Sequence, residues 1–165
     1  MPIALLSAFA AGIITCFAPE QDCARLAIGA VDAATHEILV NAYVLTTGSG
    51  LPAALIRAHR RGIDIRILAY RRTPCDLQQG LDAAAAAGIP VWIDARARIA
   101  HVKALIIDRR VTIMGSYNWS KGAAANCEDL NVVTSTDVAE TYAQHWRARQ
   151  QDAVPFDSAA HWCRR

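Results

Sequence analysis

The chain has 165 residues, a formal net charge of +2, and 53% hydrophobic against 19% charged residues. This composition excludes a disordered chain, and the length suits one compact domain with a sizeable core. The small net charge does not by itself require a polyanionic partner.

The first twelve residues form an apolar stretch that two interpretations fit equally well. The run contains Ala8-Phe9-Ala10, which is typical of a signal-peptide cleavage site, but no basic residue precedes its apolar part. It is too short to span a bilayer, so a shortened leader and a buried first strand are both compatible with it. A leader would place the protein in the periplasm or outside the cell, and the cytoplasm is the alternative.

Strands and helices alternate in the first part of the chain. The apolar periodicity predicts strands at 13–17 and 36–45, a helix at 22–34, and a helix that begins near Pro52 and ends near Gly62. The run IDIRILAY at 63–70 alternates apolar and polar residues, which predicts a half-exposed or edge strand. An Ala-rich helix from about Asp76 to Gly88 and a strand at 89–94 follow.

The second part of the chain predicts a hairpin, one more strand and a last helix. Strands at 100–107 and 111–116 flank the three-residue turn 108–110, and a further strand is expected at 130–135. Asp137, with Glu140 three residues later, is expected to open a helix that buries Val138, Tyr142 and Trp146. The whole pattern predicts an α/β domain in which helices flank a mixed β-sheet.

The cysteines do not indicate a metal or redox site. They fall at irregular spacing without a CxxC pair, which argues against a zinc knuckle or a thioredoxin-like site. We expect most of them to be small buried apolar residues, and a Cys16–Cys23 bridge or a bridge between subunits remains open. The five are Cys16, Cys23, Cys75, Cys127 and Cys163.

The predicted hairpin carries polar residues where a core would exclude them. Residues two apart in a strand share a face, so His101 and Lys103 should point the same way, as should Ser116 and Asn118. Val102 would then point into the core with its neighbours, and Gly115 would let a ligand or a second chain approach the backbone. An imidazole and three hydrogen-bond donors converging on one spot suit a phosphodiester.

The spacing of these residues fixes six identities: His101, Lys103, Asp108, Gly115, Ser116 and Asn118. With usage near about 5% per residue type, a chance match is on the order of 10⁻⁸ per start position. The run HVKALIIDRRVTIMGSYNWS resembles the HxKx4Dx6GSxN signature of the phospholipase D superfamily at every signature position. Further stretches between residues 13 and 150 are similar to the small single-motif members, the bacterial Nuc-type endonucleases. Tyr70 departs from the pattern, because many relatives carry an acidic residue there.

The resemblance implies a role for each signature residue. His101 would attack phosphorus and form a phosphohistidine, while Lys103 and Asn118 hold the non-bridging oxygens. Ser116 would be a further donor or a contact behind them, and Glu128, in NCEDL, would accept the other ring N–H of His101. Asp108 has the opposite strand parity and is expected to secure the turn.

The resemblance also implies a homodimer. Release of an alkoxide needs a general acid, and one histidine cannot attack phosphorus and protonate the leaving group at once. Because the chain has one copy of the motif, a two-fold dimer would supply the second His101 at the subunit interface. No cofactor and no metal is expected, since no carboxylate cluster suited to Mg²⁺ is visible in the sequence.

We interpret the substrate as nucleic acid: DNA, or RNA. Four arginines are expected to rim the cleft and contact the phosphate backbone without reading bases, and no stable membrane association is expected. The alternatives are a phospholipase D-type phosphatidyl hydrolase, for example of cardiolipin, and a non-catalytic nucleic-acid-binding dimer. The predicted organisation is an apolar leader or strand extension at 1–12, the phosphodiesterase domain at 13–152 and an irregular tail at 153–165. The rim residues are Arg71, Arg72, Arg96 and Arg98.

Overall fold

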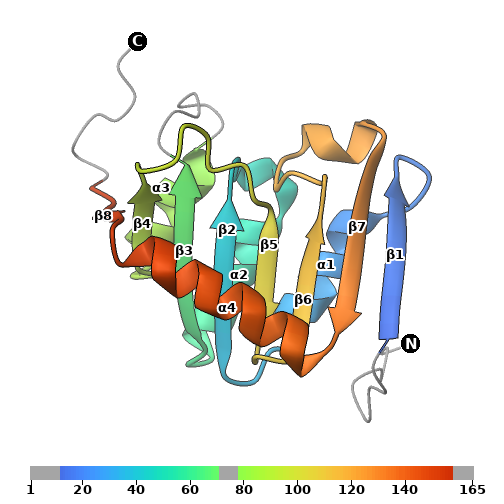
Figure 1. Cartoon of the computed structure of the whole chain (residues 1–165). Coiled ribbons are helices and arrows are strands. Elements are labelled where there is room, and N and C mark those ends of the chain that lie inside the picture. The colour runs from blue at the N-terminus through green and yellow to red at the C-terminus, as the bar shows by residue number, and fades with distance from the viewer. Residues whose placement is uncertain (1–11, 71–77, 158–165) are drawn as a thin grey trace.

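An eight-stranded sheet with helices on both faces makes up the computed structural model, which describes residues 12–70 and 78–157 (Figure 1). The strand order is β1-β7-β6-β5-β2-β3-β4-β8, in which β2, β3 and β4 are parallel and all other neighbours are antiparallel. This arrangement confirms the predicted α/β fold with a mixed sheet. The strands are β1 (Gly12–Ala18), β2 (Glu37–Ala42), β3 (Asp64–Tyr70), β4 (Val91–Asp94), β5 (Ala104–Ile107), β6 (Val111–Gly115), β7 (Glu128–Thr134) and β8 (Val154–Pro155).

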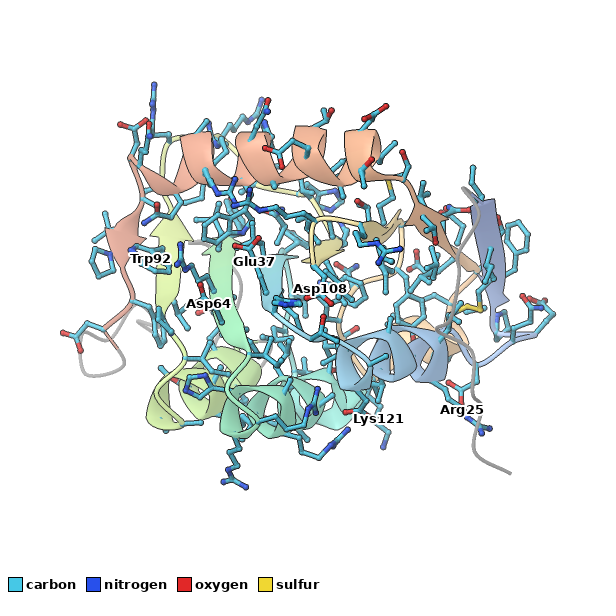
Figure 2. The ribbon with its side chains drawn as sticks, turned by 90° about the horizontal axis from the view of Figure 1, so that it is seen from below. Arg25, Glu37, Asp64, Trp92, Asp108 and Lys121 are labelled. Carbon is cyan, nitrogen blue, oxygen red and sulfur yellow. A yellow bond between two sulfur atoms is a disulfide. The ribbon has the colours of Figure 1, made fainter. Side chains whose placement is uncertain are left out.

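The helices divide between the two faces of the sheet. Helices α1 (Cys23–Asp32), α2 (Leu51–Arg60) and α3 (Gln79–Ala86) lie on one face, and α4 (Thr136–Gln150) crosses the other (Figures 1 and 2). The larger core cluster lies under α1–α3, and a smaller cluster around Leu39, Ile106 and Trp146 lies under α4. Strand β2 is buried from Ile38 to Ala42 because both of its faces are covered.

Strand β3 lies in the interior of the sheet, so the prediction of a half-exposed or edge strand was wrong. It pairs with β2 on one side and with β4 on the other, and it is buried from Ile67 to Tyr70. The polar residues that suggested an exposed face are Asp64 and Arg66, which pair with each other near the start of the strand. The continuous run of buried residues is the apolar second half of the strand.

The hairpin strands are shorter than predicted, and this places the signature residues in loops. Strand β5 begins at Ala104 and β6 ends at Gly115, so His101 and Lys103 precede one strand and Ser116 follows the other. Val102 is 39% exposed, which contradicts its predicted place in the core. Asp108 and Arg109 both have φ of 51°, the left-handed conformation that tight hairpin turns require.

Helix α4 begins at Thr136, one residue earlier than predicted. Ser135 caps it by accepting a hydrogen bond from the backbone N–H of Val138, and Asp137 lies inside the first turn, where a negative charge favours the helix dipole. Its buried residues are Ala139, Ala143 and Trp146, whereas Val138 and Tyr142 are half-buried. The tail predicted as irregular from residue 153 contributes the short strand β8, which pairs with β4.

A disulfide joins Cys16 of β1 to Cys23 at the start of α1, which resolves one of the alternatives left open by the sequence. Cys127 is free and exposed, and Cys75 and Cys163 lie outside the described residues. Two short 3₁₀ helices, η1 (Thr47–Ser49) after β2 and η3 (Gly122–Ala125) after β6, lie at the end of the sheet where β2 and β6 end. No helix within 12–70 or 78–157 is both long and apolar enough to cross a membrane.

Candidate active site

The signature residues lie at one end of the sheet, where the parallel strands β2–β4 and strand β6 end and where β5 and β7 begin (Figure 1). Ligands of open α/β sheets commonly bind beyond the carboxyl ends of the strands, where loops carry functional side chains on a rigid frame. His101 and Lys103 lie in the loop before β5. Ser116 and Asn118 follow β6, and Glu128 begins β7.

His101 is exposed and is held by aromatic contacts. Its ring meets the edge of the Tyr43 ring at a centroid distance of 4.4 Å, and Tyr43 stacks on Tyr70 at 5.4 Å. The partial burial of the imidazole lowers its pKa below 6.5, and the nearby charge of Lys103 lowers this pKa further. His101 is therefore mainly neutral at neutral pH, which is the form that can attack phosphorus.

Lys103 lies behind His101 and is buried. Its ammonium group donates a hydrogen bond of 2.8 Å to the backbone carbonyl of His101 and lies 4.8 Å from the centroid of the Tyr43 ring. Burial lowers the pKa of Lys103 to about 8, although the carboxylate of Glu128 acts in the opposite direction. A buried cation of this kind can stabilise an anionic phosphate strongly, because little water screens it.

Ser116 and Glu128 are joined directly. The Ser116 hydroxyl donates to Glu128 and accepts from the backbone N–H of Asp129, and the Asn126 amide donates to Glu128 at 3.2 Å. In the described part of the chain, neither ring nitrogen of His101 has a hydrogen bond, so the predicted Glu128–His101 contact is not made. The carboxylate instead acts electrostatically on Lys103.

The remaining signature residues at this end of the sheet are Gly115, which ends β6, and Asn118, in the loop that follows it. A Cβ on Gly115 would lie 2.3 Å from the backbone oxygen of Asp129, so this glycine serves a close contact within the sheet. The segment that approaches Gly115 closely is therefore β7 of the same chain, and the approach of a ligand or a second chain stays a prediction. Asn118 is half-buried, and its Oδ1 is buried without a partner among the described residues.

Asp108 lies at the opposite end of the hairpin and secures the turn, as interpreted from the sequence. Its carboxylate accepts hydrogen bonds from the hydroxyl and N–H of Thr35 and from the N–H groups of His36 and Glu37, at 2.7–3.0 Å. Burial would raise the pKa of Asp108, but these bonds outweigh it and hold the pKa below its usual value. Asp108 therefore belongs to the frame and not to the reacting centre.

The arginine rim is only partly described. Arg96 and Arg98 lie in the loop between β4 and β5, and both are exposed. Arg96 forms an ion pair with Asp152, which neutralises part of the expected positive rim. Arg71 and Arg72 lie outside the described residues.

A pocket of about 250 Å³ opens beside His101 toward α4. Its lining includes Tyr70, at the position where many relatives are expected to carry an acidic residue. It also includes residues that the sequence did not single out, among them Asp94 at the end of β4 and His145 and Arg149 of α4. The spacing of His145 and Arg149 by four residues on one helix face was the available signal. Within the described ranges, no group of three or more His, Cys, Asp or Glu side chains is arranged to hold a metal ion.

Comparisons with known proteins agree with this geometry. A family model described as "Cardiolipin synthase, PLD-like domain" matches residues 28–149. The chain is 34% identical to the phospholipase D of Rickettsia bellii over 139 residues, which cover 84% of this chain and 69% of the relative.

Two solved structures share the fold over their whole length. The phospholipase D family member Nuc from Salmonella typhimurium has a TM-score of 0.85 and 28% identity, covering 90% of this chain and 100% of its own. NucT from Helicobacter pylori has a TM-score of 0.78 and 22% identity, covering 89% of this chain and 100% of its own.

Proposed function

This chain belongs to the phospholipase D superfamily, and from its site we propose that it hydrolyses phosphodiester bonds of nucleic acid through a phosphohistidine on His101. The observation that carries the proposal is the pairing of an exposed, neutral imidazole with a buried ammonium group that donates a hydrogen bond to the backbone of the same residue. An imidazole alone is a common surface feature. An imidazole backed by a buried cation is suited to an anionic electrophile.

The reaction proceeds in two displacements. A neutral ring nitrogen of His101 forms a bond to phosphorus, the bond to the leaving oxygen breaks, and that oxygen takes a proton from a general acid. Water then loses a proton to the same group, now a base, its oxygen attacks phosphorus, and the phosphorus–nitrogen bond breaks. Lys103 and Asn118 hold the non-bridging oxygens in both steps, and Ser116 is held in place by Glu128.

The acid is supplied by a second copy of the chain in this proposal. The large apolar side chains nearest His101 in sequence, Ile99 and Val102, are 52% and 39% exposed, and exposed apolar surface next to a site is typical of an interface. Their burial between two copies related by a two-fold axis would bring both His101 side chains to one phosphate.

Mixed dimers test this arrangement. His101→Ala should abolish hydrolysis of plasmid DNA in EDTA while leaving the dimer folded, and His36→Ala, on another exposed histidine, should keep full activity. A dimer with one His101→Ala subunit should lose nearly all activity; half of the wild-type rate would show independent sites. Loss of wild-type activity in EDTA would contradict the metal-independent mechanism, and wild-type rates from His101→Ala would contradict the nucleophile.

A phosphatidyl hydrolase of the same mechanism is the second candidate. It is favoured by the family description, which names cardiolipin synthase, and by the relatives named phospholipase D. Plasmid DNA, single-stranded RNA and phosphatidyl lipids assayed side by side in EDTA distinguish the candidates. Binding of DNA without cleavage of any substrate would instead support the non-catalytic dimer.

A further inference from the structure

The pocket beside His101 is separate from the groups that would hold the phosphate. It reaches His145 and Arg149 of α4, and its other polar or aromatic lining residues are Asn41, Tyr70, Asp94 and His101. The other half of the lining is apolar and includes Leu68 and the Ile99 and Val102 side chains that the proposed dimer would contact. The described residues assigned to the phosphate oxygens or to their support, Lys103, Ser116, Asn118 and Glu128, do not line it. His101 therefore borders a pocket that the phosphodiesterase reaction described above does not use.

The geometry of the displacement decides what can enter this pocket. In an in-line attack at phosphorus, the leaving oxygen departs on the side opposite the attacking nitrogen. A pocket lined by His101 itself lies on the attacking side, so the leaving group points away from it. The other ester oxygen is equatorial and can turn back past the imidazole into the pocket. The group held there is the one that stays on phosphorus after the first displacement.

The chemistry of the pocket wall suits a heterocyclic base. Arg149 binds Asp94 through two hydrogen bonds of 2.6 and 2.8 Å, made by Nη2 and Nε, which leaves Nη1 available to a ligand. The buried Nδ2 of Asn41 has no partner among the described residues, and His145 adds an exposed imidazole. Nucleobases present carbonyl and ring-nitrogen acceptors to donors of this kind.

The volume favours the same ligand class over a lipid. Pockets that enclose a drug-sized molecule measure about 300 to 1,000 Å³, so 250 Å³ accommodates roughly a base with part of its sugar. Two acyl chains would not fit into this volume. Resting on the function proposed above, we propose that this pocket binds the nucleoside that remains on phosphorus and thereby selects nucleic acid as substrate.

Four esters with a common leaving group test the proposal. Methyl 4-nitrophenyl phosphate, the 5′ and 3′ thymidine 4-nitrophenyl phosphates and a short-chain phosphatidyl 4-nitrophenol all release nitrophenolate and differ only in the group retained. We expect kcat/KM for the better thymidine ester to exceed that for the methyl ester about tenfold or more. Ala97→Leu, which fills the pocket, and His145→Ala, which removes a donor, should each reduce this ratio severalfold, and His36→Ala should not.

Equilibrium binding separates this inference from the function on which it rests. Thymidine monophosphate should bind more tightly than methyl phosphate, and both pocket variants should lose that preference even if no ester is turned over. Equal rates and equal binding for the methyl and thymidine compounds would overturn the pocket assignment while leaving the phosphodiesterase intact. A preference for the phosphatidyl ester that Ala97→Leu abolishes would overturn the nucleoside as its ligand.

Discussion

The ammonium group of Lys103 donates a 2.8 Å hydrogen bond to the backbone carbonyl of His101, two residues before it. The bond ties a buried cation to the residue that carries the exposed imidazole. Burial lowers both pKa values, that of Lys103 to about 8 and that of His101 below 6.5. Between these two values the imidazole is neutral and the ammonium is charged, which is the combination that the proposed attack requires.

This pair predicts the pH dependence of the first displacement. With methyl 4-nitrophenyl phosphate, whose leaving group needs no proton, kcat/KM should rise through a pH below 6.5 as His101 becomes neutral. It should fall above about pH 8 as Lys103 loses its charge. Lys103→Arg stays charged at all these pH values, so the decline above pH 8 should disappear even though the maximal rate is lower. An unchanged decline would show that Lys103 is not the group responsible.

Asp108 should contribute to stability and not to the chemistry. Asp108→Ala leaves four hydrogen-bond donors of residues 35–37 without their acceptor, and we expect a loss of about 2 kcal/mol in the free energy of unfolding by urea. Asp64→Ala removes an exposed carboxylate that pairs with Arg66 and should cost less than about 0.5 kcal/mol. The kcat/KM of the folded Asp108→Ala variant for methyl 4-nitrophenyl phosphate should stay near the wild-type value.

The stabilisation by Asp108 should also depend on pH. Its pKa is lower in the folded protein than in the unfolded chain, so its contribution is complete above the unfolded pKa and is lost as the pH falls through the folded pKa. The difference in stability between wild type and Asp108→Ala should therefore shrink under acid conditions. A difference that stays constant down to strongly acid pH would contradict this account.

The sequence predicted the elements of the sheet well because their signals are local. The alternation of strand and helix follows from apolar periodicity, and the HxK and GSxN spacing indicates the candidate site from the sequence alone. The interior position of β3 escaped prediction because its two polar residues pair with each other at its start, which imitates the pattern of an exposed strand. Strand order depends on contacts between distant segments, which periodicity does not encode.

The surroundings of the site were less predictable than its signature residues. The aromatic contacts of Tyr43 and Tyr70 and the pocket residues of α4 come from segments far apart in the chain. The partner of Glu128 was misjudged for a related reason: the sequence placed this carboxylate near the site, but its hydrogen bonds come from Ser116 and Asn126.

Gly115 is predicted to tolerate no side chain. An added Cβ would lie 2.3 Å from the backbone oxygen of Asp129 and 2.9 Å from its carbonyl carbon. These backbone atoms cannot move freely, because Asp129 pairs with Phe17 in the β1–β7 ladder and its oxygen accepts hydrogen bonds from the N–H groups of Ser116 and Tyr117. We expect Gly115→Ala to cost about 3 kcal/mol or more in urea unfolding. Gly29 of α1 has no atom within 4 Å of its Cβ position, so Gly29→Ala should instead stabilise the protein by about 0.5–1 kcal/mol. Equal effects of the two variants would show that the close contact is not decisive.

Glu128→Gln distinguishes the two roles considered for this carboxylate. The negative charge of Glu128 raises the pKa of Lys103, so its removal should lower that pKa below about 8 and move the decline of kcat/KM to lower pH. The rise that reports His101 should stay in place, because burial and Lys103 are what shift the pKa of His101. A carboxylate that oriented His101 would have the opposite signature, since its loss would move the rise and leave the decline unchanged. Glu20→Gln removes an exposed carboxylate from a turn and should move neither limb, so any common shift would reflect net charge alone.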